Sequence, residues 1–69
     1  MSTLADQDAA KQTQLNLLVG QDVVLIVLGY DKPVFGEVAI ANPTHVDITP
    51  PGELDVSIYY HYIISIRVA

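Results

Sequence analysis

Six side chains that can stack on a flat ligand or hydrogen-bond to its edge gather in two short stretches of this sequence. They are Asn42, His45 and Asp47 in the first stretch, and Tyr60, His61 and Tyr62 in the second. Imidazole and phenol rings stack on nucleobases, and each stacked base contributes about 1–3 kcal/mol. A carboxylate such as that of Asp47 accepts hydrogen bonds from ring N–H groups. These residue types have the chemistry that contact with a nucleobase requires, and a family resemblance is what implies that role for them.

A catalytic interpretation of the same residues has less support. His45 and Asp47 lie two apart on an expected strand, so their side chains share a face and form a possible acid–base pair. The chain has no cysteine nucleophile, no glycine-rich phosphate loop and no metal-ligand spacing between its two histidines. We therefore expect a protein that is not an enzyme and that holds neither a metal nor another cofactor.

Each of these residues also has a purely structural interpretation. A histidine beside a turn is commonly a solvated surface residue, and tyrosine is favoured on the half-buried face of a strand. At least one of Tyr59, Tyr60 and Tyr62 is expected in the core or at an interface. Among the cationic groups, only His61 and Arg67 are expected near the second stretch.

The elements that must position these residues are one helix and five strands. Residues 1–19 are expected to form the helix, with Thr3 as a candidate N-cap, Leu15 and Leu18 docked on the sheet, and Gly20 as the C-terminal cap. After the helix, β-branched residues stand in short blocks separated by glycine and proline, which predicts strands. The expected strands are residues 22–28, 33–41, 45–49, 53–60 and 62–68.

This order of elements predicts a mainly β fold, with an N-terminal α-helix followed by a five-stranded, strongly bent antiparallel barrel in a single domain of residues 1–69. Gly36 lies in the middle of the second strand, where a glycine marks a bend. The last two strands have almost no connector, which places His61 at a tight corner.

Composition predicts that the chain associates with itself. Its 69 residues are 51% hydrophobic, but a chain this short buries only about 60% of the surface that its unfolded form exposes. Without cysteine no disulfide can add stability, and the apolar edge from Ile63 to Val68 would invite aggregation in a monomer. We therefore expect a homo-oligomer.

Charge and hydropathy restrict the partners. Three Lys and Arg against eight Asp and Glu give a net charge of −5, which argues against indiscriminate nucleic-acid binding but leaves a local site open. The longest apolar run, Val23 to Leu28, is too short to span a bilayer, and Asp6 and Asp8 stand where an export signal would be basic. The expectation is a soluble, cytoplasmic protein without a membrane partner.

Several motifs, taken in order, resemble the Sm-like family of ring-forming RNA-binding proteins, which includes bacterial Hfq. The likeness covers about residues 4–68. The matching segments are Leu15-Asn-Leu-Leu-Val-Gly20, Asp22-Val-Val-Leu-Ile-Val-Leu28, Phe35-Gly36-Glu37-Val38, Asn42-Pro43-Thr44-His45-Val46-Asp47 and Ile58-Tyr59-Tyr60-His61-Tyr62-Ile63. They are similar to the family's helix end, its first strand, its bent second strand, its first Sm motif with one residue inserted, and its second Sm motif.

Three positions depart from the family pattern. Asn42 replaces the usual Asp, Asp47 replaces the usual base-contacting Asn, and Tyr60 stands where Hfq has Lys. The likeness therefore lies in the order and spacing of the motifs across a short chain, and it suggests a divergent, acidic member of bacterial or phage type.

The resemblance implies a homo-oligomeric ring of about five to seven subunits, in which the fourth strand of one subunit pairs with the fifth strand of the next. It implies that the two stretches meet around the ring's pore and there bind single-stranded RNA or DNA, in RNA processing or regulation. The alternative is a ring-forming structural or adaptor barrel that binds proteins without binding nucleic acid.

Overall fold

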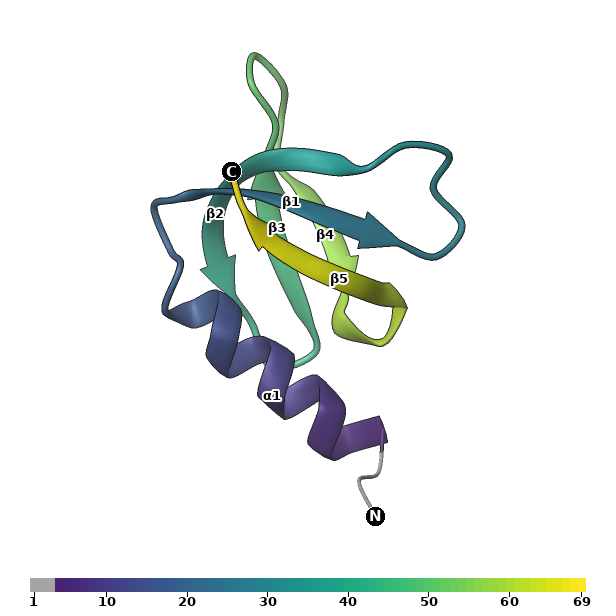
Figure 1. The fold of residues 1–69 in the computed structure, drawn as a ribbon. Coiled ribbons are helices and arrows are strands. Elements are labelled where there is room, and N and C mark those ends of the chain that lie inside the picture. Colours follow the sequence, from purple (N-terminus) through teal and green to yellow (C-terminus); the bar gives the residue numbers. More distant parts are fainter. Residues whose placement is uncertain (1–3) are drawn as a thin grey trace.

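A computed structural model describes the backbone of residues 4–69 and the side chains from Gln7 onward. Its elements, in chain order, are α1 (Leu4–Asn16), β1 (Asp22–Val27), β2 (Val34–Ala41), β3 (His45–Thr49), β4 (Val56–Tyr59), the 3-10 helix η1 (Tyr60–Tyr62) and β5 (Ile63–Val68). This order confirms the predicted mainly β fold of one helix followed by five strands (Figure 1). The first three residues of the predicted helix lie outside the described residues.

Helix α1 ends before residue 19, where the sequence pattern placed its end. The N–H of Leu18 donates to Leu15 O at 3.0 Å instead of to the carbonyl four residues back, so the last turn is tightened. Gly20 follows with a φ of +89°, a left-handed conformation that glycine adopts without a steric penalty. No helix within the described residues is long and apolar enough to cross a membrane.

The five strands form one antiparallel sheet in the order β4-β3-β2-β1-β5. The sheet curves strongly (Figure 1), and register shifts between Ile26 and Val27 and between Val38 and Ile40 add to the bend. The predicted barrel is nevertheless not closed. The short η1 turns the chain so that β5 pairs with β1, while β4 pairs with β3, and this leaves β4 and β5 as the two edges.

Gly36 has the structural role that the sequence predicted for it. A Cβ atom at this position would lie 2.6 Å from Thr49 O and 2.7 Å from Ile48 Cγ2. Only a residue without a side chain lets the bent strand β2 pass this close to the end of β3, so the curvature of the sheet depends on Gly36.

The concave face of the sheet holds the core. In β1, Val23, Leu25 and Val27 are buried, whereas Ile26 on the other face is 40% exposed. Leu15 of α1 is fully buried in the same core, and Leu18 packs against its margin, as the sequence predicted for both residues. Helix α1 therefore covers one end of the curved sheet (Figure 1).

Replacing Leu15 with alanine should destabilise the protein by about 2–5 kcal/mol, because the change leaves a cavity where α1 meets the core. Leu17→Ala is the matched control, since Leu17 is 76% exposed and its loss should cost less than about 0.5 kcal/mol. Urea unfolding followed by circular dichroism measures both values. Equal losses for the two variants would contradict docking of α1 through Leu15.

Candidate functional site

Pairing of β3 with β4 brings the two chemistry-bearing stretches together. His45, at the start of β3, lies opposite Tyr59 at the end of β4, and η1 follows Tyr59 directly. The loop before β3 is fixed by the N–H of Asn42, which donates to His45 O at 2.8 Å. The first stretch and the second are therefore neighbours at one end of the sheet.

Four aromatic side chains form a continuous row across this junction. Their rings meet edge to face, with centroids 5.9 Å apart for His45 and Tyr59, 6.4 Å for Tyr59 and Tyr62, and 5.3 Å for His61 and Tyr62. Tyr59 and Tyr62 are 56% and 47% exposed, and His61 is exposed as well. This aromatic row of His45, Tyr59, Tyr62 and His61 thus presents ring surface to solvent.

Tyr59 is a member of the row that sequence reasoning treated only as a strand residue. Nothing in its local sequence separates it from Tyr60, which follows it. The distinguishing feature is the register of β3 against β4, which sets Tyr59 beside His45. Alternation along β4 gives the same result, because Ile58 is buried and Tyr59 therefore faces outward.

Asp47 follows His45 by two residues on β3, opposite Ser57 of β4, and three polar neighbours contact it. Its Oδ1 accepts a hydrogen bond from Ser57 Oγ at 2.8 Å, and its Oδ2 accepts one from Asn42 Nδ2 at 3.3 Å. The Nε2 of His45 is 3.8 Å from Oδ1, an ion pair when the imidazole is protonated. Both carboxylate oxygens thus have partners within the protein. The role of Asp47 is therefore to position Asn42 and His45, and direct contact with a ligand is secondary.

Tyr60 points inward and is fully buried, unlike its neighbours His61 and Tyr62. Its hydroxyl donates to Asn42 O at 2.6 Å, and its N–H donates to Thr44 O at 3.3 Å. Burial raises the pKa of Tyr60 to about 12, and the negative charge of Asp47 adds to the rise. Although the sequence placed Tyr60 among the binding residues, its buried side chain joins η1 to the 42–45 loop from below.

Helix α1 brings a cation, Lys11, to this site. The sequence predicted only His61 and Arg67 as cationic groups near the second stretch. Lys11 Nζ donates to Tyr60 O at 2.7 Å, which sets its ammonium group against η1. The periodicity of the helix contained this signal, because Lys11 lies one turn before the buried Leu15 and shares its face. Arg67, expected near the second stretch, instead lines a separate hollow with Val24 and Pro33.

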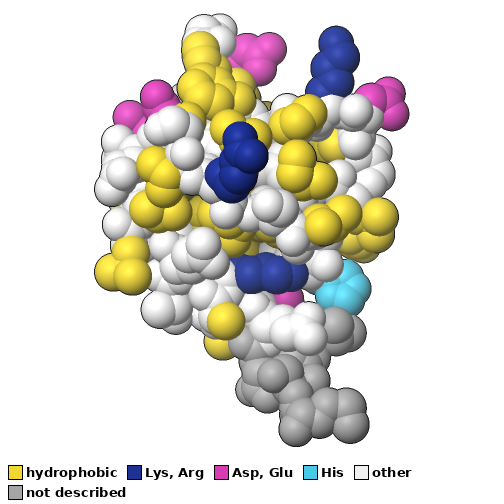
Figure 2. Space-filling view, viewed as in Figure 1, with side chains coloured by type: hydrophobic (Ala, Val, Ile, Leu, Met, Phe, Trp, Pro, Cys, Tyr) yellow, Lys and Arg dark blue, Asp and Glu magenta, His cyan; other side chains and the backbone are white. Residues whose placement is uncertain are grey.

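A hollow of ≈ 400 Å³ opens between α1, the 42–45 loop and η1. The residues that line it are Asp8, Thr44, Tyr59, His61 and Tyr62. One oxygen of Asp8, Oδ1, is buried without a hydrogen-bond partner among the described residues. Figure 2 shows basic, acidic and histidine side chains gathered where α1 meets the sheet. The hollow therefore combines ring faces with both a hydrogen-bond acceptor and nearby cationic groups.

Comparison of the chain with protein-family models, with curated proteins and with solved structures found no match in any of the three. Among the side chains that the structure describes, those of residues 7–69, no three of histidine, aspartate or glutamate lie close enough to hold a metal ion. The geometry of the aromatic row is therefore the basis for assigning a function.

The raised pKa of Tyr60 predicts a loss of stability in alkali. An unfolded tyrosine ionises near pH 10 and folded Tyr60 only near pH 12, so the stabilisation is complete below pH 10 and is lost as the pH rises toward 12. Tyr60→Phe should be less stable at pH 7 by about 1 kcal/mol, because Asn42 O loses its donor. Its free energy of unfolding should then fall less steeply above pH 10.

Guanidinium unfolding from pH 7 to pH 11.5 measures both effects. Tyr30→Phe serves as the control, because it removes a tyrosine hydroxyl at a position that is 50% exposed. If the free energy of unfolding fell equally steeply above pH 10 for the wild type and for Tyr60→Phe, folding would not raise the pKa of Tyr60.

Proposed function

We propose that this chain is an Sm-like module that assembles into a ring and binds single-stranded RNA through the aromatic row. The observation that carries this proposal is the row itself, with four rings in contact across β3, β4 and η1, of which Tyr59, His61 and Tyr62 are exposed and His45 is half-buried. A single strand can splay its bases onto such rings, whereas a duplex keeps its bases stacked inside. Stacking then supplies most of the binding free energy.

The charge distribution also supports a local site with weak phosphate contacts. The chain carries a net charge of −5, so long-range attraction of RNA is small and the salt dependence of binding should be shallow. Lys11 offsets this charge locally, because its ammonium group is held against η1 beside His61. It places a cation close to Tyr60, the position at which Hfq has a lysine in its second motif.

The open sheet supports assembly. Strands β4 and β5 are both edges, and an uncovered edge presents unpaired backbone groups. Ile64 is 65% and Val68 57% exposed on β5. Pairing of β4 in one copy with β5 in the next would cover the edges and the apolar side chains together, in a ring of about five to seven copies.

A second candidate function, a ring-shaped adaptor for other proteins, is favoured by the net charge of −5 alone. It uses the same assembly but leaves the aromatic row without a nucleic-acid ligand. The two candidates differ in one measurement, the binding of short oligonucleotides.

Fluorescence anisotropy with labelled U-rich and A-rich RNA should detect binding that tightens from pH 8 to pH 6. Imidazole ordinarily becomes cationic over this range, and His45 faces Asp47 while His61 faces the hollow lined by Asp8. Tyr62→Ala should weaken binding about 5- to 150-fold, equivalent to one lost stack of about 1–3 kcal/mol. Replacing both His45 and His61 with alanine should abolish the pH response.

Matched controls lie outside the hollows that the aromatic row lines. Phe35→Ala removes an exposed aromatic ring on β2 and Lys32→Ala an exposed cation of the 28–33 loop. Neither should change affinity, whereas Lys11→Ala should weaken it. Absence of binding at pH 6 in low salt would reject the RNA-binding function and leave the adaptor function, and labelled DNA of the same sequence tests the preference for RNA.

Light scattering should give a mass of about five to seven times 7.5 kDa. The N–H of Ala69 donates to Asp22 O in β1 at 3.0 Å, and the β1–β5 register is regular from Val68 to Ile66, so by alternation the N–H of Ile66 points to the free edge. Ile66→Pro should therefore dissociate the ring, whereas Ile66→Ala, which loses the same side-chain packing but keeps the N–H, should keep the ring. A wild-type mass of a single chain at micromolar concentration would contradict assembly.

A further inference from the structure

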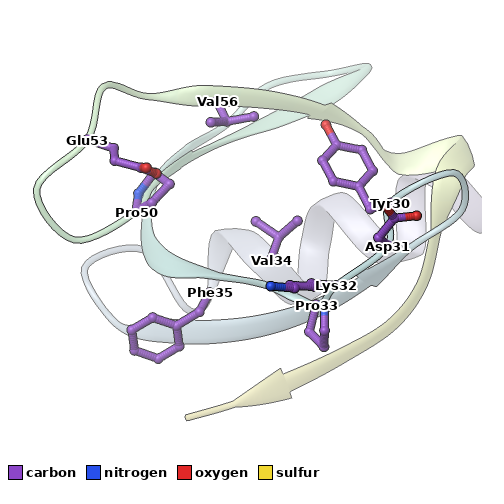
Figure 3. A pocket seen from close by; sticks show the side chains of 9 residues that line it. All are labelled: Tyr30, Asp31, Lys32, Pro33, Val34, Phe35, Pro50, Glu53 and Val56. Atoms are coloured by element: carbon purple, nitrogen blue, oxygen red, sulfur yellow. The ribbon is translucent and has the colours of Figure 1, made fainter.

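The two ends of the curved sheet are covered unequally. Helix α1 covers one end, where Leu15 is fully buried. At the opposite end the 28–33 loop and the 50–55 loop enclose a hollow of ≈ 520 Å³ that is open to solvent. Figure 3 looks into this hollow, with α1 visible behind it. We refer to it as the distal hollow.

The floor of the distal hollow is the core itself. Val34 and Val56 are half-buried, pack against the core and point into the opening, as Figure 3 shows. Tyr30 directs its ring across the same opening. Just outside it, Leu54 of the 50–55 loop is 89% exposed. Apolar surface therefore continues from the core, through the hollow, to the tip of a loop, which is the form of a surface that binds a protein.

Acidic side chains dominate the rim of this apolar surface. Asp31 and Glu53 line the distal hollow, and Asp55 follows in the same loop. Lys32 is the one cationic group in the lining, and neither it nor the two lining acids forms an ion pair within the described residues. A basic occupant matches this surface, because two acids against one lysine line the hollow and the chain as a whole carries a net charge of −5. A second copy docked through the same face would bring its own Asp31 and Glu53 against these acids.

We propose that the distal hollow binds a basic, apolar peptide segment of another protein. A leucine-sized side chain of that segment enters between Val34 and Val56, and a neighbouring lysine or arginine meets Asp31 or Glu53. Leu54 packs over the bound segment from the 50–55 loop. The binding groups named here, Val34, Val56, Asp31, Glu53 and Leu54, do not belong to the aromatic row, so the proposal does not rest on RNA binding. Tyr30 lines both the distal hollow and the hollow beside Tyr59 and Tyr62, and the tests therefore leave Tyr30 unchanged.

Three synthetic peptides of equal length test this proposal on the assembled, full-length protein. The first alternates lysine and leucine, the second replaces its lysines with glutamate, and the third replaces its leucines with serine. Titration followed by NMR should shift the methyl signals of Val34 and Val56 with the first peptide. The glutamate and serine peptides should each bind at least about tenfold more weakly than the first peptide, because one lacks the charge match and the other the apolar contact.

Variants of exposed residues separate this site from general attraction to an acidic protein. Glu53→Gln should weaken the lysine–leucine peptide about two- to fivefold, as expected for one exposed ion pair. Leu54→Ser should weaken binding of the same peptide at least about two- to fivefold. Glu37→Gln, the matched control, removes the same charge from an exposed position on β2 and should leave the affinity unchanged.

Three outcomes would overturn the proposal. The first is the absence of methyl shifts at millimolar peptide. The second is equal weakening by Glu53→Gln and Glu37→Gln, which would mean that only net charge attracts the peptide. The third is movement of the Val34 and Val56 signals on dilution of the protein alone, which would assign the distal hollow to a contact between copies of this chain.

Discussion

The inward turn of Tyr60 is the interaction on which the rest of this small structure depends. Between β4 and β5 the chain has only the three residues of η1 in which to reverse its course. The first residue of η1 is fixed because Tyr60 is buried, with its hydroxyl donating to Asn42 O at 2.6 Å and its carbonyl accepting from Lys11 Nζ at 2.7 Å. One residue thus joins the helix, the 42–45 loop and the last two strands.

The open sheet follows from the same turn. Because η1 directs β5 across to β1, the sheet has two free edges instead of a closed seam. The turn also puts His61 and Tyr62 outside while Tyr60 goes inside. The features that support assembly and those that support ligand binding therefore have a common local cause, and a change that moved Tyr60 outward would alter both.

Much of this fold could be predicted from the sequence, because glycine, proline and β-branched residues mark where elements begin and end. Gly20 and Gly36 have the roles that their positions indicated, and the predicted strand at residues 45–49 matches β3 in both bounds. The predicted last strands were longer than β4 and β5. Propensity cannot show that a run of tyrosines stops pairing and turns as a 3-10 helix, since tyrosine favours strands in either case.

The candidate site was predictable only in part, for a different physical reason. Local motifs identified His45 and His61, but which of three neighbouring tyrosines is buried depends on the register between β3 and β4. The contact of Lys11 with Tyr60 O joins residues 49 apart in sequence. Contacts of this kind arise from tertiary packing, and the sequence shows them only as a shared helix face with Leu15.

An acidic chain can still hold a site for an anionic strand if the charges are separated in space. The two lining acids of the distal hollow, Asp31 and Glu53, lie at the end of the sheet that α1 leaves open. At the other end Asp47 keeps its negative charge, but both of its carboxylate oxygens accept hydrogen bonds within the protein, from Ser57 and Asn42, and its side chain is 24% exposed. Asp8, whose Oδ1 lacks a partner among the described residues, is the exception there. Salt and solvent screen a phosphate that stays outside the hollow, and the unpartnered oxygen of Asp8 favours a base that presents an N–H group at that point.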